Sequence, residues 1–482
     1  MKQSSLRQRV LRSKWRIALR ELNEVWAGME RTSTLPDLAE YAALRRGTPA
    51  GANEIRALLT GSTALLLAFH VTEGPVVTFG VTGADRELRV VRNPYAGRMA
   101  RTPAPHPGQT PRTPKELTSR FLADAHEDFA SLLAPVLRWS EPADIICLVP
   151  HGPLHQVPLG ALDIDLGDGT VGPLITRNPV VYLPSASTLR HVRARTRPRK
   201  ETRRARAIVV ADTMTAAPVV HGRLQAADLA ARFGACVLSG AEVTMERVLA
   251  ALDEQGRMDL LHLACHGFFD SEEPLRSGVH LAGDDLLTAA DILELRLDAD
   301  LVALAACDSG LGGHRPGDEL IGLTRSLLYA GAASVLVTLW KVEEISTMLL
   351  LREFYARWEA GASKAESLRQ AQLSVSAVHP DQLISYHQEI SADLSAADVG
   401  TRRQLDRGFA DALLKARRFA EANTAYEELL ASAASDSPES LELTALLARS
   451  RRASRATPAS TAYRPYADPY YWAGFTLVGS WE

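Results

Sequence analysis

Cysteine is scarce in this sequence: four occur among 482 residues, at positions 147, 236, 265 and 307. So few thiols exclude a disulfide scaffold and are typical of a reducing compartment. An excess of charge of one sign is also missing, because 54 basic and 57 acidic residues leave a net charge of −3. Nucleic-acid-binding domains usually carry a strong basic excess. The balance therefore argues against a chain dedicated to binding nucleic acid.

Long apolar runs are absent as well. The longest, such as 301–307 and 334–340, are far shorter than the roughly 20 residues that span a membrane. The first twenty residues carry seven basic side chains and no apolar core of a signal peptide. We therefore expect a cytoplasmic protein without a membrane span. The hydrophobic content of 46% is ordinary for a globular chain, here of roughly two to four domains.

Changes of pattern along the chain divide it into six predicted segments. They are a helical cap (1–60), a small α+β part (61–190), a basic linker (191–206), an α/β core (207–378), a helical insertion (379–463) and a C-terminal strand that returns to the core (464–482). In the core, near-continuous apolar strands alternate with helices, which predicts a mostly parallel sheet covered on both faces. The cap has apolar residues from Leu6 to Leu22 on one helical face, and its basic side chains either are solvated or contact nucleic acid or membrane.

The helical insertion contains one pattern typical of a tetratricopeptide hairpin. Small residues at Ala412 and Ala422 allow two helices to approach closely, while Phe419 and Tyr426 fill the seam between them. A single unit of this kind cannot bury its own apolar face. It is therefore expected to dock on the body, on other helices of the insertion or on a partner. The segment is either a peptide-binding repeat or an ordinary helical hairpin. The tail from 450 to 462 is predicted to be flexible.

Two strands of the predicted sheet end in reactive residues. The strand at 258–264 leads to His266, and the strand at 300–306 leads to Cys307. Functional groups collect at the carboxyl ends of strands in an open parallel sheet. The interval of 41 residues between His266 and Cys307 is long enough for one helical crossover to a neighbouring parallel strand. An imidazole and a thiol brought together in this way can form an activated cysteine nucleophile.

The neighbouring residues refine this hypothesis. Gly267 permits a sharp turn, so that its N–H and the N–H of Cys307 can stabilise an oxyanion. The alternative is that the cysteine is a small core residue and that the histidine satisfies loop carbonyls. Cys265 is expected to face the core because successive strand side chains alternate. Four further residues are interpreted as structural: Cys147 and Cys236 in apolar strands, and His151 and His155 in a turn.

The ordered set of motifs resembles the CHAT family of caspase-like peptidases, relatives of separase. The motifs are Leu260-Leu261-His262-Leu263-Ala264-Cys265-His266-Gly267, Asp300 to Gly310, Gly317 to Leu323, Ala330-Gly331-Ala332, Val337 to Glu344, Val149 to Pro158, Leu183 to Ser187 and the closing Tyr-Tyr-Trp-Ala segment. They extend over most of residues 60–378 and 466–480. As an ordered set they are highly specific.

The resemblance implies an α/β fold, a caspase-like three-layer α/β/α sandwich with a mostly parallel sheet, in which residues 61–190 form a pseudo-catalytic half. It also implies thiol-dependent endopeptidase activity without a metal or organic cofactor. The family's catalytic pair is carried over to His266 and Cys307, and its oxyanion donors to the backbones of Gly267 and Cys307. An acidic residue that selects a basic residue before the cleaved bond matches Glu344, and Asp308 is a second candidate. Alternatively, Glu343 and Glu344 only favour the first turn of a helix.

By analogy with the family, the chain is expected to cleave a protein partner under the control of a regulatory protein, in antiviral defence or programmed cell death in bacteria. The Arg-rich stretches 190–206 and 450–455 are candidate sites of self-cleavage. The rival hypothesis is a catalytically idle scaffold that binds partners through its helical insertion. A third, regulation by nucleic acid through the N-terminal basic helices, has little support from the composition.

Overall fold

The computed structural model describes residues 24, 49–59, 64–71, 75–83, 87–93, 114–195, 206–211, 220–268, 270, 273–283, 285–305, 318–340, 342–393, 399–434, 437–456 and 463–482. Of the predicted N-terminal cap, this includes one complete helix, α3 (Ala52–Leu59). The apolar helical face predicted from Leu6 to Leu22 lies outside the described residues.

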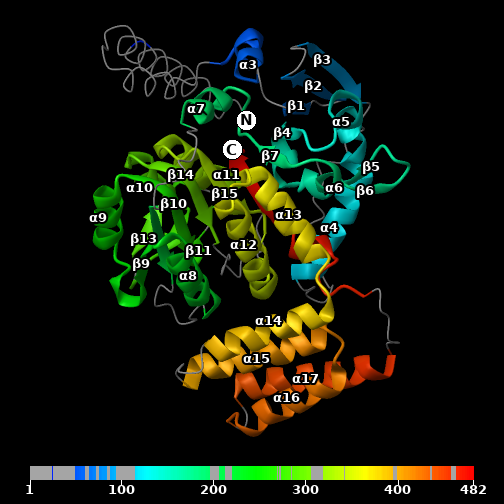
Figure 1. Ribbon diagram of the computed structural model, residues 1–482, viewed down its shortest axis with the longest axis vertical. Coiled ribbons are helices and arrows are strands. Elements are labelled where there is room, and N and C mark those ends of the chain that lie inside the picture. The colour runs from blue at the N-terminus through cyan, green and yellow to red at the C-terminus, as the bar shows by residue number, and fades with distance from the viewer. Residues whose placement is uncertain are drawn as a thin grey trace, which may run out of the picture.

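An eleven-stranded sheet runs through the molecule (Figure 1). In order across the sheet, the strands are β3 (Leu88–Asn93), β2 (Val76–Thr82), β1 (Ala64–Val71), β4 (Ile145–Val149), β7 (Val180–Tyr182), β16 (Phe475–Gly479), β15 (Ser334–Thr338), β14 (Asp298–Leu304), β10 (Arg257–Ala264), β8 (Ala207–Ala211) and β9 (Cys236–Ser239). Among these strands, the pairs β3/β2, β2/β1 and β16/β15 are antiparallel and the others are parallel. The predicted α/β class with a mostly parallel sheet is confirmed.

Alternate residues of the central strands pack into two different cores, as the pleat of a doubly covered sheet requires. In β10, Leu260 and Ala264 join one core while Leu261 and Leu263 join the other. Helices α8 (Val220–Phe233), α12 (Glu344–Glu359) and α13 (Lys364–Ser376) cover the first face, and α9 (Met245–Gln255), α10 (Ala289–Glu294) and α11 (Asp318–Ala330) cover the second. These layers form an α/β/α sandwich.

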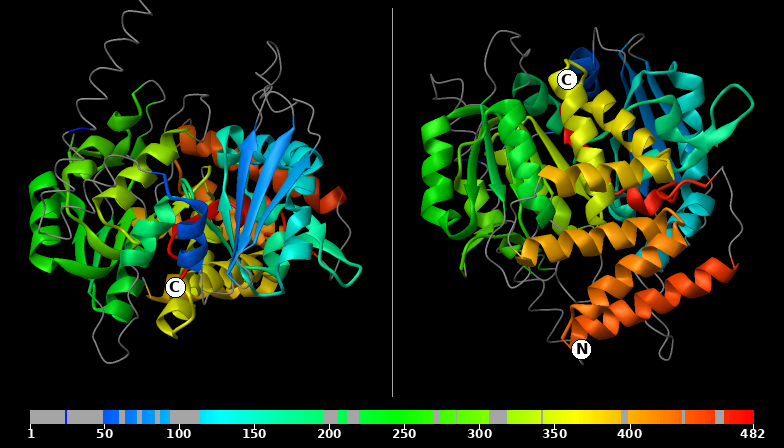
Figure 2. Two further views of the ribbon diagram at one scale, coloured as in Figure 1. Left: turned by 90° about the horizontal axis from the view of Figure 1, so that it is seen from above. Right: turned by 60° about the horizontal axis from the view of Figure 1, so that its bottom comes forward.

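The C-terminal strand β16 joins two halves of the sheet. It pairs in parallel with β7 of the N-terminal half and antiparallel with β15 of the C-terminal half. The N-terminal half begins with the antiparallel meander β1–β3 (Figure 2). It also contains α4 (Pro114–Phe129), α5 (Ala134–Trp139), β5 (Asp163–Asp165), β6 (Val171–Pro173), α6 (Leu174–Arg177) and α7 (Thr188–Arg195). The return of the C-terminal segment to the core, as predicted, therefore closes one continuous sheet.

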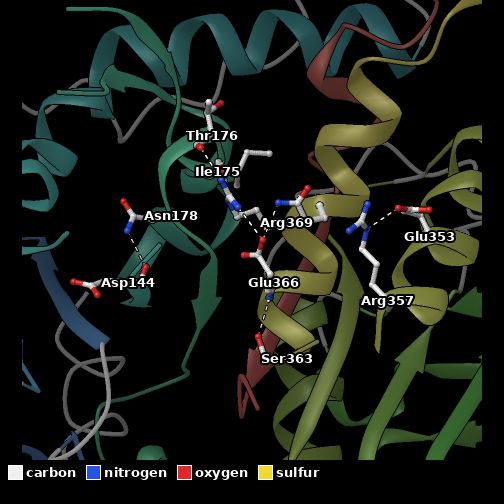
Figure 3. Close-up of polar contacts among 10 residues, drawn as sticks. Asp144, Ile175, Thr176, Asn178, Glu353, Arg357, Ser363, Glu366 and Arg369 are labelled. Atoms are coloured by element: carbon white, nitrogen blue, oxygen red, sulfur yellow. Dashed lines mark hydrogen bonds and ion pairs between the residues drawn. The ribbon is translucent and has the colours of Figure 1, made fainter. Parts of the chain in front are cut away.

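Helix α13 connects the two halves a second time, on one face of the sheet (Figure 3). The guanidinium of Arg369 donates hydrogen bonds to the carbonyl oxygens of Ile175 and Thr176 in α6, both at 2.7 Å. Glu366, one turn earlier on α13, holds the same guanidinium at 2.9 Å. This helix therefore clamps the N-terminal half to the half of the sheet that contains β10, β14 and β15.

The range predicted as a basic linker begins with ordered structure. Helix α7 continues through residues 191–195, so its end lies later than the sequence indicated. Val192 is buried, Arg193 pairs with Glu482, and Arg195 donates to the Leu328 carbonyl oxygen at 3.0 Å. Residues 191–195 therefore belong to a helix that packs on the body and are not part of an extended linker.

The insertion consists of four consecutive helices: α14 (Pro380–Asp393), α15 (Val399–Lys415), α16 (Phe419–Ala431) and α17 (Pro438–Ala456). They stack at one end of the molecule, below the sheet in Figure 1. As expected for the α15–α16 hairpin, Ala412, Ala422 and Tyr426 are fully buried, while Phe419 is only partly buried. The flexible tail predicted from residue 450 is wrong for 450–456, because Ser450 is fully buried and α17 continues to Ala456.

Candidate active site

Three adjacent parallel strands, β10, β14 and β15, end at the same edge of the sheet. His266 follows β10 by two residues, and Glu344 begins the helix that follows β15. Between them, β14 is paired with β10 so that Leu304 lies opposite Leu263. The ladder extends one residue further, since the Ala305 N–H donates to the Leu263 carbonyl oxygen at 3.0 Å. Cys307 and Asp308 follow in the sequence and lie outside the described residues.

His266 is positioned by a small three-stranded sheet at this edge. Its strands are β11 (Gly267–Phe268), β12 (Gly278–His280) and β13 (Leu286–Thr288). The backbone N–H of His280 donates to the carbonyl oxygen of His266 at 2.8 Å, and the His266 side chain is half-buried. The backbone of the predicted catalytic histidine is therefore held directly by β12.

The same ladder sets the direction of the Gly267 backbone. Gly267 lies opposite Val279, and the bond from His280 to His266 flanks this pair. In an antiparallel ladder, a pair flanked in this way directs its own N–H and C=O groups away from the partner strand. The Gly267 N–H consequently lies on the outer side of β11, an edge strand of the small sheet.

The packing of β12 on β13 leaves no room for a side chain at Gly278. A Cβ built there would lie 2.3 Å from the carbonyl oxygen of Leu287. Glycine is thus required for the close approach that brings β12 beneath the His266 backbone. The sequence analysis missed this residue, although a glycine inside a strand pattern is a recognised signal of close backbone approach.

The other described cysteines lie away from this edge or face the core. Cys265 is buried and its thiol donates to the Val210 carbonyl oxygen at 3.6 Å, as the alternation along β10 predicted. Burial raises the pKa of Cys265 to about 12 and raises the pKa of Cys147 far above its usual value. Cys236 is half-buried in β9, the edge strand of the large sheet next to β8. A high thiol pKa leaves little thiolate, so Cys147 and Cys265 are poor nucleophiles.

The two acidic residues after β15 have different surroundings. Glu343 caps α12, because its side chain accepts a hydrogen bond from the Ser346 N–H at 2.8 Å. It also forms an ion pair with Lys415 of the insert. Glu344, the first residue of α12, is exposed and lines a groove of about 600 Å³ between α12 and α15. Glu343 therefore caps α12 and Glu344 lies in its first turn, as the helix interpretation predicted. Glu344 also faces a groove that the sequence did not reveal.

The histidines interpreted as structural are engaged in packing or backbone contacts. His151 Nδ1 accepts a hydrogen bond from the Val71 N–H at 3.2 Å, and its ring centroid lies 4.9 Å from that of His70. His155 lies within the short 3₁₀ helix that follows β4. Of the buried histidines that the sequence analysis did not consider, His262 is bonded at 2.8 Å to both the Tyr355 hydroxyl and the Gln225 side-chain oxygen. Burial lowers the pKa of His262 to about 3, so it is neutral at physiological pH.

The described residues contain no cluster of three or more His, Cys, Asp and Glu side chains arranged to hold a metal ion. Among the described helices, none combines the length and apolar character that a membrane crossing requires.

Comparisons with known proteins give three kinds of match. The family model described as the CHAT domain matches residues 125–480. The curated protein "Tetratricopeptide repeat protein 28" is 39% identical over 99 residues in the mouse (Mus musculus) and 36% identical over 99 residues in the human (Homo sapiens). Each match covers 20% of this chain and 4% of the relative, so the chain spans a small fraction of the curated relatives it matches.

Solved structures give distant likenesses. The Arg-specific cysteine proteinase gingipain R matches 55% of this chain and 63% of its own, at 13% identity and a TM-score of 0.31. A separase–securin complex of Saccharomyces cerevisiae matches 66% of this chain and 29% of its own, at 10% identity and a TM-score of 0.43.

Proposed function

The chain belongs to the CHAT-domain family, and from this membership we propose that it is a caspase-like cysteine endopeptidase with a His266/Cys307 dyad. One observation carries the proposal: β10 and β14 are neighbouring parallel strands with Leu263 opposite Leu304. His266 and Cys307 each stand three residues beyond this pair in the sequence. Two peptide units reach at most about 7 Å, so the position of Ala305 limits how far Cys307 can lie from the end of β10.

In the proposed reaction, His266 takes the proton of the Cys307 thiol as the sulfur attacks the scissile carbonyl carbon. The negative charge on the carbonyl oxygen is stabilised by the N–H groups of Gly267 and Cys307. The outward direction of the Gly267 N–H supports this role. The C–N bond breaks as His266 returns the proton to the leaving amine. Water, deprotonated by His266, then hydrolyses the thioester and regenerates the thiol.

We further propose that the substrate is a protein cleaved after a basic residue. Glu344 lies at the same edge of the sheet, at the start of the helix that follows β15, and its carboxylate is exposed. A carboxylate binds Arg or Lys through a charge-assisted hydrogen bond. Asp308 is the second candidate for this selectivity. Control by a regulatory protein and a role in antiviral defence or programmed cell death follow by analogy with the family. A cytoplasmic location, supported by the scarcity of cysteine, completes the proposal.

The alternative function is that of an idle scaffold that binds partners through α14–α17. The four helices support this alternative, because a stack of hairpins offers a surface for another protein. Peptidase activity requires the thiol of Cys307, whereas a scaffold role does not.

A library of fluorogenic peptides, varied at the residue before the cleaved bond, tests the proposal. We expect cleavage after Arg or Lys that is abolished in Cys307→Ala and reduced about 10³-fold in kcat/KM in His266→Ala. Cys236→Ala, which removes a half-buried thiol outside the site, is the matched control and keeps full activity. The regulatory partner is not identified, so labelling by a peptidyl acyloxymethyl ketone provides a second readout. The scaffold is favoured if Cys307 does not react with the ketone and if cleavage is either absent or unchanged in Cys307→Ala.

A further inference from the structure

The groove beside Glu344 is formed jointly by the catalytic core and the helical insert. Its volume is about 600 Å³, and α15 contributes Gly400, Gln404, Gly408 and Asp411 to its wall. Residues at this spacing share one face of a helix. The face from 400 to 411 is about 16 Å long, which is the length of an extended peptide of roughly five residues. The shape of the groove therefore suits a stretch of polypeptide better than a compact small molecule.

The charges of the groove favour a basic ligand. Four carboxylates line it, from Glu343, Glu344, Asp411 and Glu439, against two guanidinium groups, from Arg403 and Arg407.

Both arginines are engaged within the insert. Arg403 binds Glu439 at 2.6 Å and the Leu429 carbonyl oxygen at 3.1 Å. Arg407 binds Glu442, outside the groove wall, at 2.7 Å. Carboxylates of the wall are paired as well: Glu439 with Arg403, Asp411 with Arg407 and Glu343 with Lys415. Four carboxylates thus meet three cations, and the groove keeps a small excess of negative charge.

The position of the groove connects it to the proposed active site. Glu344 belongs to the groove wall and also begins the helix that follows β15. Strand β15 is the direct neighbour of β14, which leads toward Cys307. Glu344 follows the end of β15 by six residues, so the groove wall begins on the side of the sheet at which β14 and β15 end.

We propose that this groove binds an extended basic segment of the protein substrate, beyond the residue that precedes the cleaved bond, so that the insert forms one wall of the substrate site. This inference rests on the proposed peptidase function, because the bound segment is a substrate only if the protein is a peptidase. The helical insert then determines substrate choice by direct contact, through α15. Ionic strength is expected to weaken the interaction because the groove is open to solvent.

Two residues allow the groove to be altered without breaking its ion pairs. Gln404 is exposed on the groove face of α15, and Gly400 lies in the first turn of the same helix. Gln404→Lys adds a positive charge to the groove wall, and Gly400→Trp fills the groove sterically. Thr424→Lys is the matched control, because Thr424 is an exposed residue of α16 that does not line the groove.

The experiment measures binding of fluorescein-labelled Gly-Lys-Arg-Lys-Arg-Gly to the full-length Cys307→Ala protein by fluorescence anisotropy. We expect Gln404→Lys to weaken binding roughly five- to tenfold at low salt, and less at about 0.5 M salt. Gly400→Trp should abolish binding, Thr424→Lys should leave Kd unchanged, and the peptide with Glu and Asp in place of Lys and Arg should not bind.

The proposed binding role of the groove is overturned if the basic peptide does not bind. It is also overturned if the peptide binds with equal affinity to the proteins with and without Gln404→Lys or Gly400→Trp. Circular dichroism shows whether a variant has lost its fold. If Gly400→Trp does not fold, Gln404→Lys, which adds one positive charge at an exposed position, still tests the groove. Binding that responds to these variants without any Cys307-dependent cleavage overturns the peptidase instead and leaves the groove as a docking site.

Discussion

Lys415, the last residue of α15, forms an ion pair with Glu343, the residue that caps the first turn of α12. The ammonium group also lies 5.3 Å and 5.6 Å from the ring centroids of Tyr466 and Tyr471. Cation–π attraction adds to the ion pair in such a setting. The C-terminal end of α15 is therefore attached to the first turn of α12.

The first prediction concerns this attachment. Lys415→Met is expected to lower the free energy of unfolding by about 1–2 kcal/mol, since both side chains are only partly exposed and the pair lies between the surface and buried cases. Chemical denaturation measures the change. A double-mutant cycle with Glu343→Gln, which keeps a side-chain acceptor for the helix cap, isolates the pair. A coupling free energy near zero would show that the insert is held by other contacts.

The second prediction concerns the clamp between the halves of the sheet, drawn in Figure 3. Arg369→Met removes two charge-assisted hydrogen bonds to carbonyl oxygens of α6 and should destabilise the protein by about 2–4 kcal/mol. Arg357→Met is the control: Arg357 pairs with Glu353 on the exposed side of α12, so its loss should change stability by less than about 0.5 kcal/mol. Similar losses in the two variants would contradict the clamp.

The third prediction concerns pH. The pKa of His262 is lowered by burial to about 3, whereas an unfolded histidine titrates near 6.5. Below that pH the unfolded state binds a proton that the folded state excludes, so stability is lost as the pH falls from about 6.5 toward 3.

His262 should therefore cost roughly 2 kcal/mol of stability between pH 7 and pH 5. Urea denaturation at the two pH values measures the difference, which His262→Gln should reduce. Tyr355→Phe removes the hydroxyl bonded to His262 but retains the titrating ring, so it should keep the pH slope. An unaltered slope in His262→Gln would assign the effect to other groups.

The fourth prediction concerns the thiols. Because burial raises their pKa, Cys147 and Cys265 should resist iodoacetamide in the folded protein and react only after denaturation. Mass spectrometry of tryptic peptides distinguishes the positions. Rapid modification of Cys265 in the native state would mean that β10 opens on the time scale of labelling.

The fifth prediction concerns Gly278. An alanine Cβ would lie 2.3 Å from the Leu287 carbonyl oxygen, so Gly278→Ala must separate β12 from β13. Because β12 holds the His266 backbone, we expect kcat to fall at least tenfold in the protein that remains folded, with destabilisation of about 1–3 kcal/mol. Gly51→Ala is the control, since nothing lies within 4 Å of its Cβ position. Full activity of Gly278→Ala would show that the small sheet does not position the histidine.

The sequence by itself determined the local elements and the residues that end them. Largely apolar runs such as Arg257–Ala264 and Asp298–Leu304 specify buried strands. His266 and Cys307 follow these strands within three residues in the sequence. These features depend on side chains a few residues apart, whose periodicity is visible in the chain. The same alternation of side chains along a strand predicts that Cys265 faces the core.

Only the tertiary structure decided which distant segments meet. The joining of two half-sheets by β16, the pair between Lys415 and Glu343, which are 72 residues apart, and the groove at Glu344 have no local signal. The direction of the Gly267 N–H likewise depends on its register against Val279. Strand order, register and ion pairs across the fold are chosen by the free energy of packing the whole chain, so residues far apart in sequence determine them together.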